Sequence, residues 1–160
     1  MHKRLLAAAV LITVASIPAG ADVPFPPITN TTVKTECSAC HMLFQPQMLP
    51  KRSWQAVVDG LAKHFGEDAS LPPAKAAEVL TYLVANAADA GGPGNKFVAG
   101  LAPAATPLRI AETPYWLRKH RKVQPEVWKR ASVGGKANCK ACHQGADKGD
   151  YDDDGVRIPK

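Results

Sequence analysis

The sequence predicts an all-α fold with much coil, arranged as two small lobes. Apolar residues recur at helical spacing in several short stretches, and no alternating strand pattern of any length stands out. Of the 160 residues, 46% are hydrophobic and 21% are charged, which is too apolar for a disordered chain. A run rich in glycine, alanine and proline divides the chain near its middle. The expected parts are a leader (1–21), a first lobe (22–90), a linker (91–108) and a second lobe (109–160).

The first 21 residues are typical of a secretory signal peptide. A basic start at Lys3 and Arg4 precedes the apolar run Leu5–Ile17, and Ala19–Ala21 has the small residues of a cleavage site. The apolar run is too short to cross a bilayer comfortably, and an uncleaved membrane anchor is the alternative. We therefore expect a chain that is exported to the periplasm, cleaved after about Ala21, and not embedded in a membrane.

Three helices are expected in the first lobe. The first begins at Thr31 or Thr32, either of which can cap it, and carries the first pair of cysteines. The second, Ser53–Gly66, has apolar residues along one face and a glycine at its end. The third is expected from a proline pair to about Ala88.

The second lobe is expected to be short and poorer in regular structure. Thr113 is a candidate N-cap and Pro114 fits the first helical position, so a brief helix should run to Arg121. Another short helix is expected at 125–128, and a third should carry the second pair of cysteines.

All four cysteines lie in two C-x-x-C-H motifs, Cys37–His41 and Cys139–His143. This is the attachment motif of c-type haem, in which two thiols add to the two vinyl groups of one haem. The histidine that follows supplies the proximal nitrogen to the iron. The motifs therefore predict two covalent haems, bound by Cys37, Cys40, Cys139 and Cys142, with His41 and His143 as proximal ligands. A porphyrin also supplies the core that a second lobe of about 50 residues lacks.

Three other interpretations of the cysteines are a zinc site, structural disulfides and a thioredoxin-type redox motif. Zinc ribbons place their pairs about 15–20 residues apart rather than about a hundred. Export favours disulfides, and no βαβ pattern supports a thioredoxin motif. None of the three explains a histidine directly after both pairs.

The sixth ligands are expected to be His64 and His120. The usual choices are methionine or histidine. After the leader, the only methionines are Met42 and Met48, both too close to the first motif to reach the opposite face of its haem easily. Two histidines remain for two open positions, and the alternative for each is an ordinary core histidine. Local pairing joins His41 with His64 and His143 with His120, while a crossed pairing is left open.

Two six-coordinate irons have no vacant site for oxygen, peroxide or substrate, so they favour outer-sphere transfer of one electron at a time over enzymatic chemistry. The predicted function is thus a low-potential electron carrier and not an enzyme. The alternatives are an electron-entry subunit of a periplasmic reductase, or a haem peroxidase or reductase if one iron is open.

The sequence resembles the bacterial dihaem cytochromes c along nearly its whole length after the leader. The resemblance is carried by the stretches Val33–His41, Leu49–Trp54, His64–Ala69, Glu112–Arg121 and Asn138–His143. It implies a first lobe similar to class I cytochrome c, a small irregular second lobe, and bis-histidine haems with His64 and His120 as distal ligands. It also implies electron donation to a small oxygen-binding mono-haem cytochrome c, with a membrane b-type cytochrome as a possible upstream donor.

Two charged features carry weaker signals. The basic quartet, Arg118, Lys119, Arg121 and Lys122, brackets His120 and fits a docking face, a partner for haem propionates, or a solvated helix turn. Asp150, Asp152 and Asp154 match the start of an EF-hand loop without its twelfth-position glutamate, so a solvated acidic tail is the better interpretation. The net charge of +6 is too small to indicate nucleic-acid binding, and we expect a monomer.

Overall fold

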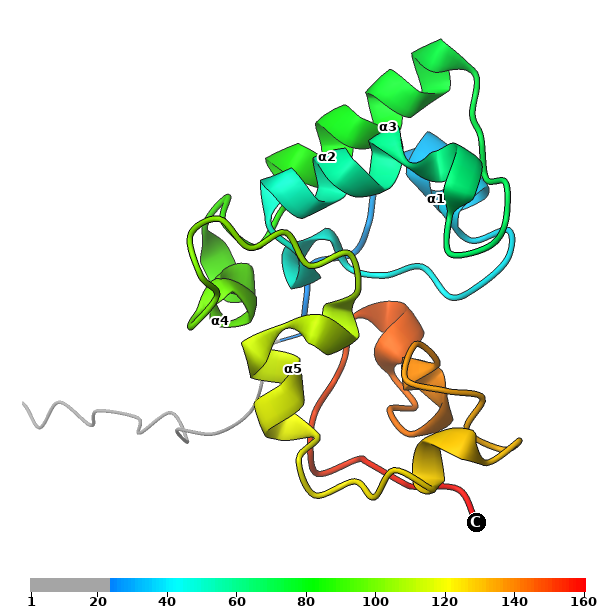
Figure 1. Ribbon diagram of the computed structural model, residues 1–160, viewed down its shortest axis with the longest axis vertical. Coiled ribbons are helices and arrows are strands. Elements are labelled where there is room, and N and C mark those ends of the chain that lie inside the picture. The colour runs from blue at the N-terminus through cyan, green and yellow to red at the C-terminus, as the bar shows by residue number, and fades with distance from the viewer. Residues whose placement is uncertain (1–23) are drawn as a thin grey trace, which may run out of the picture.

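A computed structural model describes residues 24–160 as a helical chain with much coil (Figure 1). The all-α prediction is confirmed: within these residues there is no strand, and the one isolated β-bridge joins His64 to Glu67. No helix in this part of the chain is long and apolar enough to cross a membrane. The predicted leader, 1–21, lies outside the described residues. The α-helices are α1 (Thr31–Cys37), α2 (Lys51–Asp59), α3 (Pro73–Ala85), α4 (Asn95–Val98) and α5 (Pro114–Lys119).

Short 3₁₀ turns connect the helices, and four of the seven in the described residues lie after Arg109. Each spans three residues, and poor hydrogen-bond geometry keeps such turns short. They are Pro46–Met48, Leu61–Lys63, Gly92–Gly94, Ile110–Glu112, Val127–Lys129, Cys139–Ala141 and Ala146–Lys148.

The first core lies where α2 packs against α3, with α1 beside them in the upper part of Figure 1. Its centre is formed by Val33, Leu49, Trp54, Val79 and Leu83. The indole Nε1 of Trp54 donates a buried hydrogen bond of 2.7 Å to the carbonyl oxygen of Pro46. The same carbonyl also accepts a 3.5 Å bond from the backbone N–H of Leu49, so the indole ties the proline-rich loop to α2.

The ends of the first two helices differ from the sequence-based expectation. Asn30 rather than Thr31 or Thr32 caps α1, because its side-chain oxygen accepts a 2.8 Å bond from the backbone N–H of Val33. The helix α2 begins before Ser53, whose hydroxyl is buried, and it ends at Asp59 because Gly60 has a low helix propensity. His64 therefore lies beyond α2 and not on its apolar face.

A second core joins the two ends of the described chain. It contains Phe25, Met48, Ala88 and Phe97, the last from α4 within the segment predicted as a linker. The backbone N–H of Phe25 donates a 3.0 Å bond to the carbonyl oxygen of Gly149. The N-terminal segment thus pairs with the C-terminal one, and both pack beside α4.

The predicted capping of α5 is confirmed. The hydroxyl oxygen of Thr113 accepts a 3.3 Å bond from the backbone N–H of Trp116, and Pro114 occupies the first turn. The helix ends at Lys119, so His120 forms its C-cap. The second cysteine motif lies on a 3₁₀ turn rather than on the predicted α-helix.

Candidate haem sites

The first motif is a turn attached to the end of α1. Cys37 is the last residue of the helix, and Cys40 and His41 lie in the turn beyond it. The His41 Nδ1 atom lies 2.7 Å from the carbonyl oxygen of Met42. A ring nitrogen that faces a carbonyl must carry the proton, so the Nε2 atom of His41 is left as the free acceptor.

His64 is presented at the tip of a tight turn. Its backbone N–H and carbonyl pair with the carbonyl and N–H of Glu67, at 2.8 and 3.1 Å. Between them, Phe65 adopts a left-handed φ of 54° and Gly66 a φ of 112°. The turn brings the His64 ring opposite His41, with 6.2 Å between the ring centroids and 21° between the ring planes.

His120 is held by α5 in the second half of the chain. Its ring stacks on Trp116, with 4.1 Å between centroids and 16° between planes. The His120 Nδ1 atom lies 2.9 Å from the carbonyl oxygen of Trp116, which again leaves Nε2 as the free acceptor. The His143 ring lies opposite, and the two centroids are 6.1 Å apart.

The spacing of both histidine pairs fits two imidazoles on opposite sides of one iron. A metal–imidazole bond is about 2.0 Å long and the ring centroid lies about 1.2 Å behind the nitrogen, so the two centroids should be about 6.4 Å apart. The observed separations are 6.2 and 6.1 Å. The structure thus gathers each motif histidine with the predicted local partner rather than with the crossed one.

The protonation preferences in both sites also suit a metal ligand. Burial is the main cause that lowers the pKa of His64, His120 and His143, so the neutral imidazole is favoured. Burial raises the pKa of the Cys139 thiol to about 11, and it raises the pKa of Cys37 and Cys142 as well. The neutral thiol is therefore the favoured form of these three cysteines.

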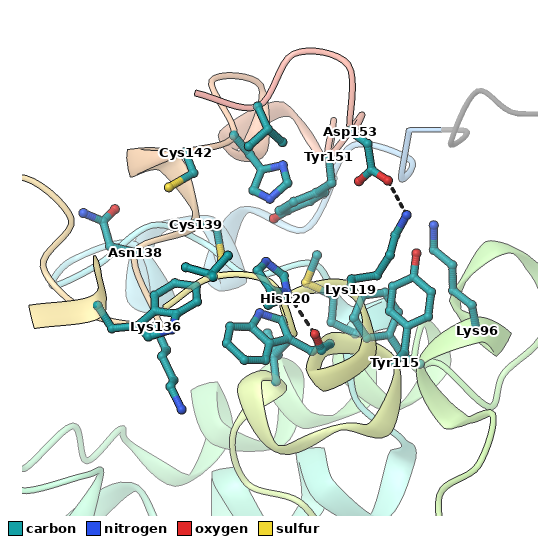
Figure 2. Close-up of a pocket in the computed structure, with 18 of the residues that line it drawn as sticks. Lys96, Tyr115, Lys119, His120, Lys136, Asn138, Cys139, Cys142, Tyr151 and Asp153 are labelled. Atoms are coloured by element: carbon teal, nitrogen blue, oxygen red, sulfur yellow. Dashed lines mark hydrogen bonds and ion pairs between the residues drawn. The ribbon is translucent and has the colours of Figure 1, made fainter. Parts of the chain in front are cut away.

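A largely apolar cavity surrounds the second histidine pair (Figure 2). Cys139 and Cys142 lie on one side of it, and the ion pair between Lys119 and Asp153 lies on the other. The hydroxyl of Tyr151 and the Nδ1 atom of His143 are buried there without a partner. The walls also include Met48 and Phe97, which precede the segment predicted as the second lobe, and the sequence analysis did not assign these residues or Tyr151 to the site.

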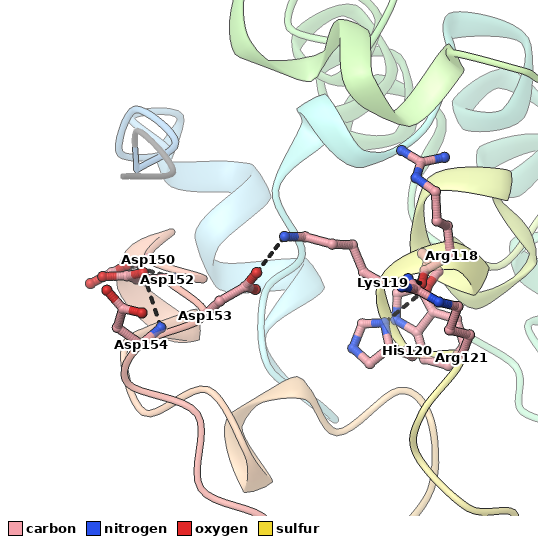
Figure 3. Close-up of polar contacts among 9 residues, drawn as sticks. Arg118, Lys119, His120, Arg121, Asp150, Asp152, Asp153 and Asp154 are labelled. Carbon is pink, nitrogen blue, oxygen red and sulfur yellow. Dashed lines mark hydrogen bonds and ion pairs between the residues drawn. The ribbon is translucent and has the colours of Figure 1, made fainter. Parts of the chain in front are cut away.

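The basic quartet does not act as one unit (Figure 3). Lys119 reaches across to pair with Asp153, whereas Arg118 and Arg121 lie on the side of α5 away from the acidic tail. The Arg118 guanidinium lies 5.2 Å from the centroid of Tyr115. Only part of the quartet therefore faces the second cavity.

The other interpretations of the cysteines and aspartates gain no support from the geometry. None of the four cysteines forms a disulfide. Within residues 24–160, no group of three or more histidine, cysteine or acidic side chains is placed to hold a metal ion. Asp150 and Asp152 instead accept local backbone bonds of 3.0 and 3.2 Å from Asp152 and Asp154.

Comparison with known families decides what the two motifs bind. The family model for dihaem cytochrome c matches residues 33–151, which is most of the chain. The chain belongs to the dihaem cytochrome c family. Its cofactors are therefore two c-type haems with iron, for which Cys37/Cys40 and Cys139/Cys142 form the attachment motifs, and its role is haem-based electron transfer.

Solved structures are similar to this cytochrome over most of both chains. A diheme cytochrome c from Rhodobacter sphaeroides is 46% identical, with a TM-score of 0.71, and the match covers 78% of this chain and 98% of that one. A diheme cytochrome type c from Shewanella baltica is 32% identical, with a TM-score of 0.67 and coverage of 81% and 93%. A search of the curated proteins finds no significant match. The family resemblance read from the sequence is thus confirmed.

Proposed function

We propose that this cytochrome is a periplasmic electron carrier rather than an enzyme, with both irons held between two histidines. His41 and His64 hold the first iron, and His143 and His120 hold the second. The observation that carries the proposal is the pair of imidazole separations, 6.2 and 6.1 Å, each close to the spacing that one iron requires. Ligands on both sides leave no position for a substrate, so electrons pass one at a time through the haem edge.

The side chains around each histidine keep it in one orientation. The carbonyl oxygens of Met42 and Trp116 accept bonds from Nδ1 of His41 and His120, and this directs each Nε2 toward the iron. The haem supplies the one-electron couple when it is bound. Stacking of Trp116 on His120 adds a second restraint, so the ligand needs little reorganisation when the charge on the iron changes.

The proposed partners are a small mono-haem cytochrome c as electron acceptor and a membrane b-type cytochrome as donor. The sequence resemblance supports this assignment. The exposed cations Arg118, Arg121 and Lys122 beside the second site favour an acceptor with an acidic face. We propose that the chain works as a monomer after export and removal of the leader.

Carbon monoxide tests the ligand assignment directly. The reduced wild-type protein should keep its low-spin absorbance spectrum when carbon monoxide is added, because neither iron has an open position. A carbon monoxide complex in the wild type would overturn the proposal and favour a peroxidase or reductase. Copurification at low salt gives a separate test. A free carrier should purify from a cell extract without a bound partner, whereas an electron-entry subunit should purify together with its reductase.

A further inference from the structure

The side chain of Arg109, in the segment that precedes α5, lies beside the turn that carries His64. The guanidinium carbon of Arg109 is 3.9 Å from the centroid of the Phe65 ring. The Phe65 ring in turn lies edge-on to His64, with centroids 4.8 Å apart and 61° between the ring planes. Arg109, Phe65 and His64 therefore form a continuous series of contacts that ends at the proposed iron ligand.

The backbone of this turn needs an outside contact to stay in place. Among the described residues, Phe65 is the only one other than glycine with a positive φ. A side chain with a Cβ atom is disfavoured in this conformation unless its surroundings hold it there. The ring is half exposed, and Arg109 covers one of its faces. The contact thus restrains the turn that carries His64.

The charge of Arg109 also reaches the site. The Arg109 guanidinium lies against the Phe65 ring, which itself contacts His64, so this charge lies close to the proposed first iron. Glu112 partly offsets this charge, because its carboxylate lies 3.9 Å from the Arg109 Nε atom and both side chains are half exposed. A positive charge near a haem favours the reduced iron, which carries one positive charge less than the oxidised iron.

We propose that Arg109 is a positioning residue for the first haem, which holds Phe65 and His64 in place and raises the midpoint potential of that haem. The proposal rests on the ligand role of His64 given above. It makes the first haem depend on a residue from the segment assigned to the second lobe.

Substitution of Arg109 separates the effect of its charge from the effect of its stacking. Arg109→Gln should lower the midpoint potential of the first haem and leave that of the second unchanged. Arg109→Lys keeps the charge and loses the planar contact, so it should restore most of the potential. Loss of a partly exposed cation–π contact changes an equilibrium by about two- to fivefold, so in Arg109→Gln the equilibrium between bound and detached His64 should shift toward the detached form by that factor, measured as the loss of the first haem's low-spin spectrum in urea.

Glu112→Gln is the matched control, because it removes the opposing charge and keeps an oxygen that can accept the 3.3 Å bond from the Arg109 backbone N–H. It should raise the potential of the first haem. Any of three results would overturn the proposal: an unchanged first-haem potential in Arg109→Gln, an unchanged urea dependence of that haem's low-spin spectrum in the same variant, or a shift of the same sign in Glu112→Gln. His64→Ala distinguishes these failures from failure of the ligand assignment, because it must open the first haem to carbon monoxide if His64 is a ligand.

Discussion

Replacing His120 by alanine removes the imidazole that faces His143 across the second site. Cys139, Cys142 and His143 are untouched, so the haem should stay attached to the chain. Its iron should become at least partly high-spin, because among the described residues the histidine ring in contact with His120 is that of His143, which is the proposed ligand on the other side. The reduced variant should therefore bind one molecule of carbon monoxide per chain, where the wild type binds none.

The same substitution should also lower stability. His120 is half-buried, and its ring stacks on Trp116 and bonds to the Trp116 carbonyl oxygen at 2.9 Å. An aromatic pair contributes about 0.5–1.5 kcal/mol and a hydrogen bond a similar amount, so their loss should lower the free energy of unfolding by about 1–3 kcal/mol. Loss of the bond to iron adds to this cost. Urea unfolding followed by tryptophan fluorescence measures the change.

The assay is a carbon monoxide titration of reduced His120→Ala, with His64→Ala as the matched variant for the first site. Each should bind one carbon monoxide per chain, the double variant should bind two, and added imidazole should compete in all three. If the perturbed haems are exchanged between the single variants, the ligand pairing is crossed. If neither substitution changes the spin state, both histidines are core residues and the bis-histidine assignment is refuted.

Three further predictions concern the cofactor, the fold and the second haem. The mature protein should have the mass of its polypeptide plus two haems, and both haems should stay with the protein in acid acetone; extraction of the colour would remove the covalent assignment. Gly149→Ala should lower the free energy of unfolding in urea by more than about 1 kcal/mol, because Gly149 has a φ of 80° and a Cβ atom there would lie 2.9 Å from the carbonyl oxygen of Phe25. A Cβ atom at Gly155 would lie at an ordinary contact distance of 4.0 Å from the carbonyl oxygen of Asp152, so Gly155→Ala should change stability little, and equal losses in the two variants would contradict the argument. Neutralising the basic quartet should lower the potential of the second haem in a redox titration, and no change in either haem would mean that solvent screens these charges.

The sequence was sufficient for the parts of this cytochrome that depend on local chemistry. Each C-x-x-C-H motif predicts its cofactor because two thiols at this spacing are the groups that attach a haem to the chain. The proposal of His64 and His120 as the distal ligands also came from elimination, since few other side chains can bind iron. The N-cap at Thr113 was also predictable, because the cap, Pro114 and the helix lie side by side in the chain.

Other features depend on contacts between distant segments, which periodicity does not reveal. The apolar pattern of Ser53–Gly66 predicted one helix, yet Gly60 ends α2 and the pairing of His64 with Glu67 turns the chain back. Tyr151 stands among aspartates and looks solvated in the sequence, but its ring packs 5.6 Å from His143. One signal was present: a lone aromatic residue within an acidic tail indicates a buried anchor.

The second haem site also explains how a short segment poor in apolar residues is held in place. Residues 109–160 have too little apolar material to close a core alone, and the missing walls come from Met48 and Phe97. The backbone bond from Phe25 to Gly149 and the contact between the Phe25 and Tyr151 rings, 5.9 Å apart, fix the tail on the same side. The two haem lobes therefore share a core at the second site. It follows that substitutions at Phe25 or Met48 should disturb the second haem more than the first, although both residues lie nearer in sequence to the first motif.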